Sequence, residues 1–139
     1  MTLVVATGVF EILHPGHIMY LNESRKLGDR LVVILASDEV LLKRKGRVVV
    51  PARQRIEVLK ALKVVDDAVV GDPKDFMLPI CELKPDIVTL GHDQDVSVRQ
   101  VRKMLADAGC GAQVVRIRKK WVSDLDSSGK IKRLYYKIQ

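Results

Sequence analysis

The chain has 139 residues, of which 47% are hydrophobic, 29% charged and only 4% aromatic, so it can build one domain around an aliphatic core. No apolar run approaches the roughly 18 residues of a membrane-spanning helix, and the two cysteines, Cys81 and Cys110, form neither a disulfide framework nor a zinc-binding spacing. The net charge of +7 indicates an anionic partner, which includes nucleotides, phosphorylated metabolites and nucleic acids.

Apolar, β-rich runs alternate along the chain with segments of helical periodicity. The predicted strands are Thr2–Thr7, Arg30–Ala36, Ala68–Val70, Asp86–Leu90 and Gln113–Ile117. The predicted helices are Pro15–Leu27, Asp38–Leu42, Pro51–Leu62, Pro73–Leu83, Ser97–Ala108 and Ser127–Tyr136, with a basic loop at Lys43–Arg47. A continuous apolar run such as Leu31–Leu35 indicates burial on both faces of a parallel sheet. The alternation predicts a single α/β domain over residues 1–139, with a Rossmann-like, doubly wound, five-stranded parallel sheet.

The clearest functional signal lies between the first strand and the first helix. Pro15 suits the first helical position, where its missing N–H needs no partner. A helix N-terminus that follows a strand offers free N–H groups and a partial positive charge, which favour phosphate. His14 and His17 are one helical turn apart, so both rings can face the same bound group and stabilise charge that develops on it. The plain alternative is that the histidines cap the helix.

Other candidates lie beyond the carboxyl ends of the strands, where doubly wound sheets bind ligands. In the basic loop, Lys43 and Lys45 are expected to contact phosphate, against the alternative of a solvated loop. Arg55 is expected either to bind phosphate or to pair with a neighbouring carboxylate. After the fourth strand, Gly91 permits close approach of the backbone to a ligand, and Asp93 can accept hydrogen bonds from ribose hydroxyls.

A last group of candidates lies near the C-terminus. Ser127 and Ser128 open the last helix, where hydroxyls and free N–H groups suit phosphate, and N-capping is the alternative. Lys130 follows them and adds a positive charge. Trp121, the only tryptophan, either stacks on a ring of the ligand or is buried at the edge of the core.

The turn resembles the signature of the HxGH nucleotidylyltransferases, the cytidylyltransferase-like family. The matching residues are Gly8, Phe10, His14, Gly16 and His17. The sequence departs from the signature at Val9, where Thr is usual, and at Glu11, where Asp is usual. Around Ser127–Ile131 it is similar to the second signature of the family, with Gly129 in place of a Ser or Thr. The resemblance extends over about residues 3 to 133.

The resemblance implies an enzyme that transfers a nucleoside monophosphate from a nucleoside triphosphate to a phosphate-bearing acceptor. It implies direct transfer, with His14 and His17 stabilising the α-phosphate and the leaving pyrophosphate. The turn residues Val9, Phe10, Pro15 and Gly16 would contact the nucleotide with them. A divalent cation, Mg²⁺ by preference, would bridge the phosphates rather than occupy a site built by the protein.

Several stretches look most like the archaeal members that transfer AMP from ATP to FMN, among them the run from Leu27 to Asp38 and the segment Lys84–Ile87. Transfer of CMP to glycerol 3-phosphate is the alternative. A homodimer is a further expectation from the resemblance, without a nucleic-acid or membrane partner. The N-terminal residues are not those of a signal peptide, and with free thiols this predicts the cytoplasm. A module that senses nucleotides or binds nucleic acid would keep the positive charge but would need no histidine pair.

Overall fold

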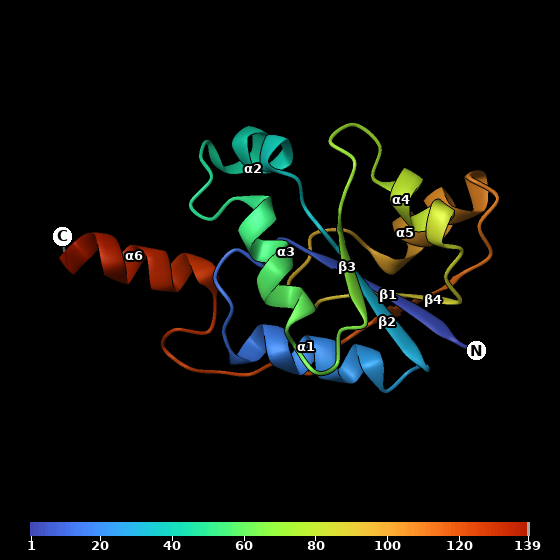
Figure 1. Ribbon diagram of the computed structural model, residues 1–139, viewed down its shortest axis with the longest axis horizontal. Coiled ribbons are helices and arrows are strands. Elements are labelled where there is room, and N and C mark those ends of the chain that lie inside the picture. Colours follow the sequence, from blue (N-terminus) through green and yellow to red (C-terminus); the bar gives the residue numbers. More distant parts are fainter. Residues whose placement is uncertain (139) are drawn as a thin grey trace.

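The computed structural model describes residues 1–138 and shows an α/β architecture (Figure 1). The strands are β1 (Leu3–Gly8), β2 (Arg30–Leu35), β3 (Asp67–Val70), β4 (Ile87–Leu90) and β5 (Gln113–Arg116). The helices are α1 (Pro15–Arg25), α2 (Asp38–Lys45), α3 (Ala52–Lys60), α4 (Met77–Leu83), α5 (Val98–Asp107) and α6 (Ser128–Ile138).

The strands form one parallel sheet in the order β3-β2-β1-β4-β5, which confirms the predicted Rossmann-like fold. From β1 the chain runs outward through β2 to β3, and it then returns to the other side of β1 with β4. The strand order therefore reverses between β1 and β4. The segments that follow these two strands meet at the carboxyl edge, where ligands bind in such sheets.

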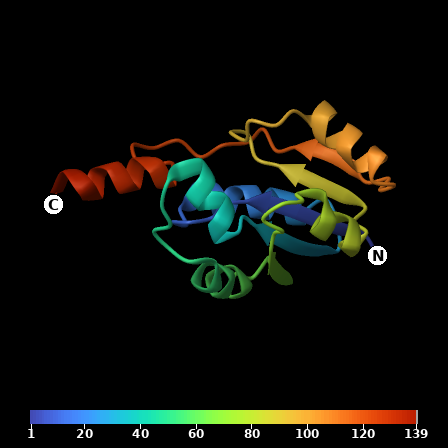
Figure 2. The same ribbon diagram turned by 90° about the horizontal axis from the view of Figure 1, so that it is seen from above.

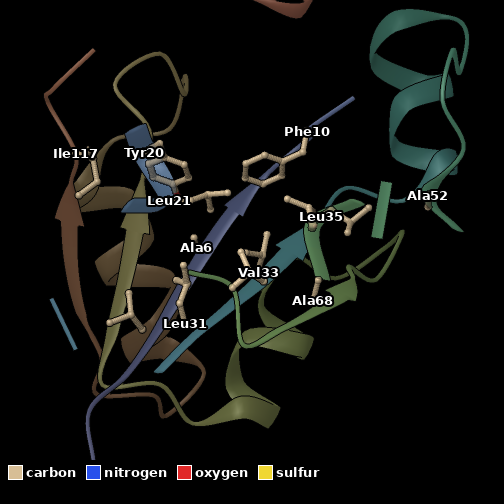
Figure 3. Packing of buried hydrophobic residues seen from close by; sticks show 13 residues of the cluster. Ala6, Phe10, Tyr20, Leu21, Leu31, Val33, Leu35, Ala52, Ala68 and Ile117 are labelled. Carbon is tan, nitrogen blue, oxygen red and sulfur yellow. The ribbon is translucent and has the colours of Figure 1, made fainter. Parts of the chain in front are cut away.

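Hydrophobic side chains cover both faces of the sheet, as the continuous apolar strands predict. On one face, residues of β1 and β2 pack with α1 and α3, as Figure 3 shows for Leu21, Leu31 and Val33. On the other face, Val5, Val88 and their neighbours pack with α4 and α5. Aliphatic side chains dominate both clusters, and Phe10 and Tyr20 are the aromatic members of the first.

Two helix boundaries differ from the predictions by three residues or more. The predicted loop at Lys43–Arg47 is wrong for its first half, because α2 continues to Lys45. Gly46 ends α2 in the left-handed conformation, with φ of 79°, and donates its N–H to Leu42 O. Basic residues suit this last turn because the carboxyl end of a helix carries partial negative charge. The fourth helix begins at Met77 rather than Pro73, because Asp72 accepts hydrogen bonds from backbone N–H groups that follow it and forms a turn there.

Helix α6 differs from the other helices because it extends away from the sheet and its flanking layers (Figures 1 and 2). None of its residues, 128–138, is buried. Its first turn lies beside the turn that follows β1, since Ser128 Oγ donates to Ile12 O at 2.9 Å. Within residues 1–138, no helix has both the length and the apolar character that a membrane span requires.

Candidate active site

The turn between β1 and α1 lies at the point where the strand order reverses. Phe10 has φ of 53°, a left-handed conformation that is uncommon for a bulky residue. Its ring folds back over Gly8, where an added Cβ would lie 2.8 Å from the ring. The ring is buried and packs against His17, with centroids 5.2 Å apart. The left-handed backbone at residue 10 thus places an apolar wall beside the second histidine.

His14 is the N-cap residue of α1, ahead of Pro15 in the first helical position. Its Nδ1 accepts the N–H of Gly16 at 3.1 Å, so the capping alternative is correct for this side chain. The same hydrogen bond implies a neutral tautomer with the proton on Nε2, which leaves that nitrogen as a donor. Gly16 provides the necessary space, because a Cβ there would lie 2.7 Å from the His14 ring.

The two histidine rings stack, with centroids 3.9 Å apart and planes tilted by 30°. Burial, followed by the positive charge of His14, lowers the pKa of His17 to about 4, with Lys45 acting in the same direction and Asp93 opposing it. Burial also lowers the pKa of His14, against the opposing effect of Asp93 and Asp126. At neutral pH the pair therefore consists of two uncharged imidazoles, which can donate hydrogen bonds.

The segment after β4 brings Asp93 to the same edge of the sheet. The negative charge of Asp93 acts to raise the pKa of both histidines, so the structure does bring these three predicted residues together. Gly91 donates its N–H to Gln94 Oε1 at 2.5 Å, and its carbonyl accepts from Arg116 Nη1 at 2.7 Å. Sequence reasoning missed Gln94 and Arg116, which fix this segment; the position of Arg116 at the end of a neighbouring strand was the available signal.

Of the two alternatives for Arg55, the structure shows the ion pair with a carboxylate. Its side chain is fully buried, and its guanidinium pairs with Asp38 Oδ1 at 2.8 Å, so the ion-pair alternative is correct. The same guanidinium donates to the carbonyl oxygens of Val9 at 2.9 Å, Ala36 at 2.7 Å and Val50 at 2.9 Å. Arg55 therefore ties the turn after β1 to the segments after β2 and before α3. It satisfies carbonyl groups that would be costly to bury alone.

The basic end of α2 approaches the histidine pair. Lys45 lies close enough to His17 for its charge to lower the pKa of that imidazole. Lys43 and Lys45 are both exposed, so their ammonium groups are accessible to an anion. The structure thus places positive charge beside the turn, and contact of these lysines with phosphate stays a prediction.

Glu11, where the family signature usually has Asp, is a buried residue of the turn. Its carboxylate accepts the backbone N–H groups of Val49 at 2.6 Å and Val50 at 2.9 Å, and it pairs with the ammonium group of Lys132. Burial alone would raise the pKa of Glu11, but the hydrogen bonds from Lys132 and the two backbone groups outweigh it and lower the pKa. Glu11 therefore serves as an internal connection between three segments.

The residues predicted at the start of α6 have partners within the protein. Ser127 Oγ accepts the backbone N–H of Lys130 at 3.1 Å, which is the N-capping alternative. Ser128 exchanges hydrogen bonds with the backbone of Ile12, and Lys130 Nζ pairs with Asp126 at 2.5 Å. The Ser128 hydroxyl proton is thus directed at Ile12 O in the turn, and contact of Ser128 with phosphate stays a prediction.

Trp121 lies between β5 and α6, in a stretch without regular secondary structure. Its side chain is 38% exposed, so the alternative of burial at the core edge is wrong. Stacking on a ligand ring stays a prediction. Among residues 1–138, no group of three or more His, Cys, Asp or Glu side chains is arranged to hold a metal ion.

Comparison with known proteins gives a consistent picture. The model of a family described as cytidylyltransferase-like matches residues 5–134. The FAD synthase of Ferroglobus placidus is 47% identical over 131 residues, which cover 94% of this chain and 86% of that protein. The FAD synthase of Methanoculleus marisnigri is 49% identical over 131 residues, covering 94% and 87%.

Two solved structures share the fold. A lipopolysaccharide core biosynthesis protein from Thermoplasma volcanium superposes with a TM-score of 0.84 at 42% identity, covering 88% of this chain and 99% of that one. The pantoate-β-alanine ligase of Francisella tularensis has a TM-score of 0.66 at 16% identity, covering 95% of this chain and 65% of that one. The second likeness concerns the fold alone.

Proposed function

The chain belongs to the cytidylyltransferase-like family, and we propose that it is an FAD synthase, which transfers AMP from ATP to FMN and releases pyrophosphate. The observation that carries the proposal is the stacked, uncharged pair His14 and His17 at the N-terminus of α1. The archaeal relatives named FAD synthase support the choice of ATP and FMN, because they match nearly the whole chain.

In this reaction an oxygen of the FMN phosphate attacks the α-phosphorus of ATP. The bond between that phosphorus and the oxygen that bridges to the β-phosphate breaks, and pyrophosphate leaves. Negative charge increases on the α-phosphate and the leaving group, where a donor aimed at the developing charge is most effective. The Nε2–H of His14 and a ring N–H of His17 would supply such donors, whereas the backbone N–H groups of Gly16, His17 and Ile18 are already bonded to His14. Since the acceptor phosphate is itself a nucleophile, the protein need only position the reactants and stabilise the developing charge.

The remaining predicted contacts surround this pair. Lys43 and Lys45 at the end of α2 would bind the β- and γ-phosphates, assisted by the first turn of α6 with Ser127 and Lys130. Asp93 would accept hydrogen bonds from the ribose, with Gly91 allowing close approach. Trp121 would stack on the adenine or the flavin ring.

The residues present fit a cation that arrives with the triphosphate. No group of three or more His, Cys, Asp or Glu side chains among residues 1–138 is arranged to hold a metal ion, and the oxygen ligands that Mg²⁺ prefers are those of the phosphates. When bound, Mg²⁺ neutralises charge on the phosphates. Phosphate oxygens and water would hold such an ion, and Asp93 keeps its proposed role at the ribose.

One assay tests the function. Purified protein with Mg²⁺ receives either FMN and ATP or glycerol 3-phosphate and CTP, and chromatography separates the products. FAD from the first pair supports the proposal. CDP-glycerol without FAD would keep the reaction class but replace the substrates, and nucleotide binding without either product would favour a sensing module. We further expect a cytoplasmic homodimer; light scattering of the purified protein tests the dimer.

A further inference from the structure

We propose that Lys132 of α6 is a positioning residue for the nucleotide site, acting through Glu11 on the segment 46–50 that follows the basic end of α2. The inference rests on the proposed function in one respect: it takes the partner of Lys43 and Lys45 to be the triphosphate of ATP.

The first step is the arrangement of hydrogen bonds around Glu11. A single carboxylate receives both the backbone N–H groups of Val49 and Val50 and the ammonium group of Lys132. The Glu11 side chain has no exposure and that of Lys132 is 15% exposed, so water cannot replace either partner easily. An aspartate, shorter by one methylene, would not span the same three donors from the same backbone position. This gives the departure at residue 11 a structural reason.

The second step is the way in which α6 is attached. None of its residues is buried, so hydrophobic packing does not explain its position. Apart from the pair of Lys130 with Asp126 just before the helix, α6 contacts the turn and the segment 46–50. Ser128 binds Ile12, Lys132 binds Glu11, and the Tyr136 ring lies 4.3 Å from the Arg47 guanidinium carbon. The helix therefore contacts that segment directly at one end and through Glu11 in the middle.

The third step is electrostatic. A buried carboxylate that loses its cation either takes up a proton or turns toward water. Both changes weaken or break the hydrogen bonds that hold Val49 and Val50. Segment 46–50 would then be free to shift, and with it Lys45, whose charge now lies near His17. Loss of Lys132 should therefore weaken the hold on the triphosphate more than the chemistry at the α-phosphorus.

The kinetic test compares Lys132→Met with Lys137→Met. The two variants remove one positive charge from the same helix, but Lys137 is exposed and does not contact Glu11. For Lys132→Met we expect the KM for ATP to rise about tenfold, as misplacement of a binding group typically allows. The KM for FMN should stay nearly constant and kcat should change less than the KM for ATP. Lys137→Met should match the wild type.

The second readout needs no substrate. Trypsin can cleave after the lysines and arginines within residues 43–47. Cleavage after Lys103 in α5 provides an internal reference. Lys132→Met should accelerate cleavage within 43–47 relative to Lys103, while the double variant Glu11→Gln with Lys132→Met should return toward the wild-type ratio. The neutral amide oxygen of the double variant can still accept the two N–H groups without leaving a buried charge unpaired. If Lys132→Met does not fold, Lys132→Arg, which keeps the positive charge, takes its place in the comparison of cleavage rates.

The two readouts separate the alternatives. Equal behaviour of Lys132→Met and Lys137→Met in both would overturn the proposal, and so would a fall in kcat without faster cleavage at 43–47. A wild-type protein that makes no FAD would defeat the proposed function instead. The proteolysis comparison would then still decide whether Lys132 holds the segment.

Discussion

The rings of His14 and His17 lie against each other at the N-terminus of α1, with centroids 3.9 Å apart and planes tilted by 30°. Two imidazolium ions would repel each other at this separation, so the geometry itself favours uncharged rings. Burial and this repulsion are the leading reasons why the pKa of His17 falls to about 4. The pair thus offers directed N–H groups rather than net charge, and we propose that the exposed Lys43 and Lys45 of α2 supply the positive charge that a triphosphate needs.

Replacement of either histidine should abolish most of the activity. We expect His17→Gln or His14→Asn to lower kcat about 100-fold or more, as loss of a transition-state donor typically does. Asparagine at residue 14 retains N-capping, so His14→Asn separates the donor from the cap. The measurement is FAD formation at saturating substrates, with circular dichroism as the control for folding. Full turnover in both folded variants would remove the pair from the mechanism.

The low pKa of His17 also predicts a dependence of stability on pH. The unfolded chain binds a proton at the ordinary histidine pKa of about 6.5, whereas the folded protein binds it only near pH 4. The stabilisation of the folded protein by uncharged His17 is therefore complete above pH 6.5 and is lost as the pH falls toward 4. At pH 5 the loss should be about 2 kcal/mol relative to pH 7.5. Urea unfolding at both pH values measures it.

The matched control for this effect is His17→Gln. In this variant the difference in the free energy of unfolding between pH 5 and pH 7.5 should shrink by the same amount. Glu11 does not obscure the comparison, because its pKa is lowered and its stabilisation is lost only at more acidic pH. An unchanged pH dependence in the variant would show that the imidazole is not desolvated in solution.

The basic end of α2 should affect kinetics and not stability. Replacing Lys43 and Lys45 together by alanine should raise the KM for ATP or lower kcat, while Tm stays nearly constant because exposed charges contribute little to folding. Lys103→Ala, at an exposed position of α5, provides the control for loss of positive charge. A large drop in Tm with normal kinetics would make this turn of the helix a structural element only.

Arg55 should behave in the opposite way. Its guanidinium serves four protein acceptors in the interior, so Arg55→Met should destabilise the fold by about 3 kcal/mol or more. Arg55→Lys should retain little of this stability, because one ammonium group cannot reproduce the planar arrangement of donors. Denaturant titration measures both variants. A lysine variant of normal stability with a raised KM for ATP would revive the phosphate role.

The sequence was informative where neighbours in the chain decide the structure. Strand–helix alternation, Pro15 and the glycines identify the sheet and the turn, because each of these signals depends only on residues close together in the sequence. Arg55 and Glu11 were harder, since their partners are distant: Arg55 binds a carbonyl 46 positions away, and Glu11 an ammonium group 121 positions away. No local periodicity encodes such pairs. The predicted loop at Lys43–Lys45 is wrong because the helix ends only at Gly46, which adopts the left-handed conformation just beyond the three basic residues.

Gly16 leaves no space for a side chain, because the His14 ring lies directly beside its Cα. A methyl group at this position would lie 2.7 Å from the His14 ring, too close for any unstrained contact. Gly16→Ala should therefore push the ring from its place and break the hydrogen bond from the Gly16 N–H to Nδ1, which orients the Nε2 donor. Because helix positions favour alanine over glycine, the variant should lose little stability and still lose kcat.

Gly111→Ala is the matched control, since nothing lies within 4 Å of a Cβ at that position. It should retain full turnover. The expected fall in kcat for Gly16→Ala is about tenfold or more, as misplacement of a catalytic group by about 1 Å can cost up to 100-fold. The ¹⁵N chemical shifts of the His14 ring report its tautomer directly, and a shift away from the Nε2–H form should accompany the loss. Normal kcat together with an unchanged tautomer would show that the ring tolerates the methyl group, and that its orientation does not depend on the glycine.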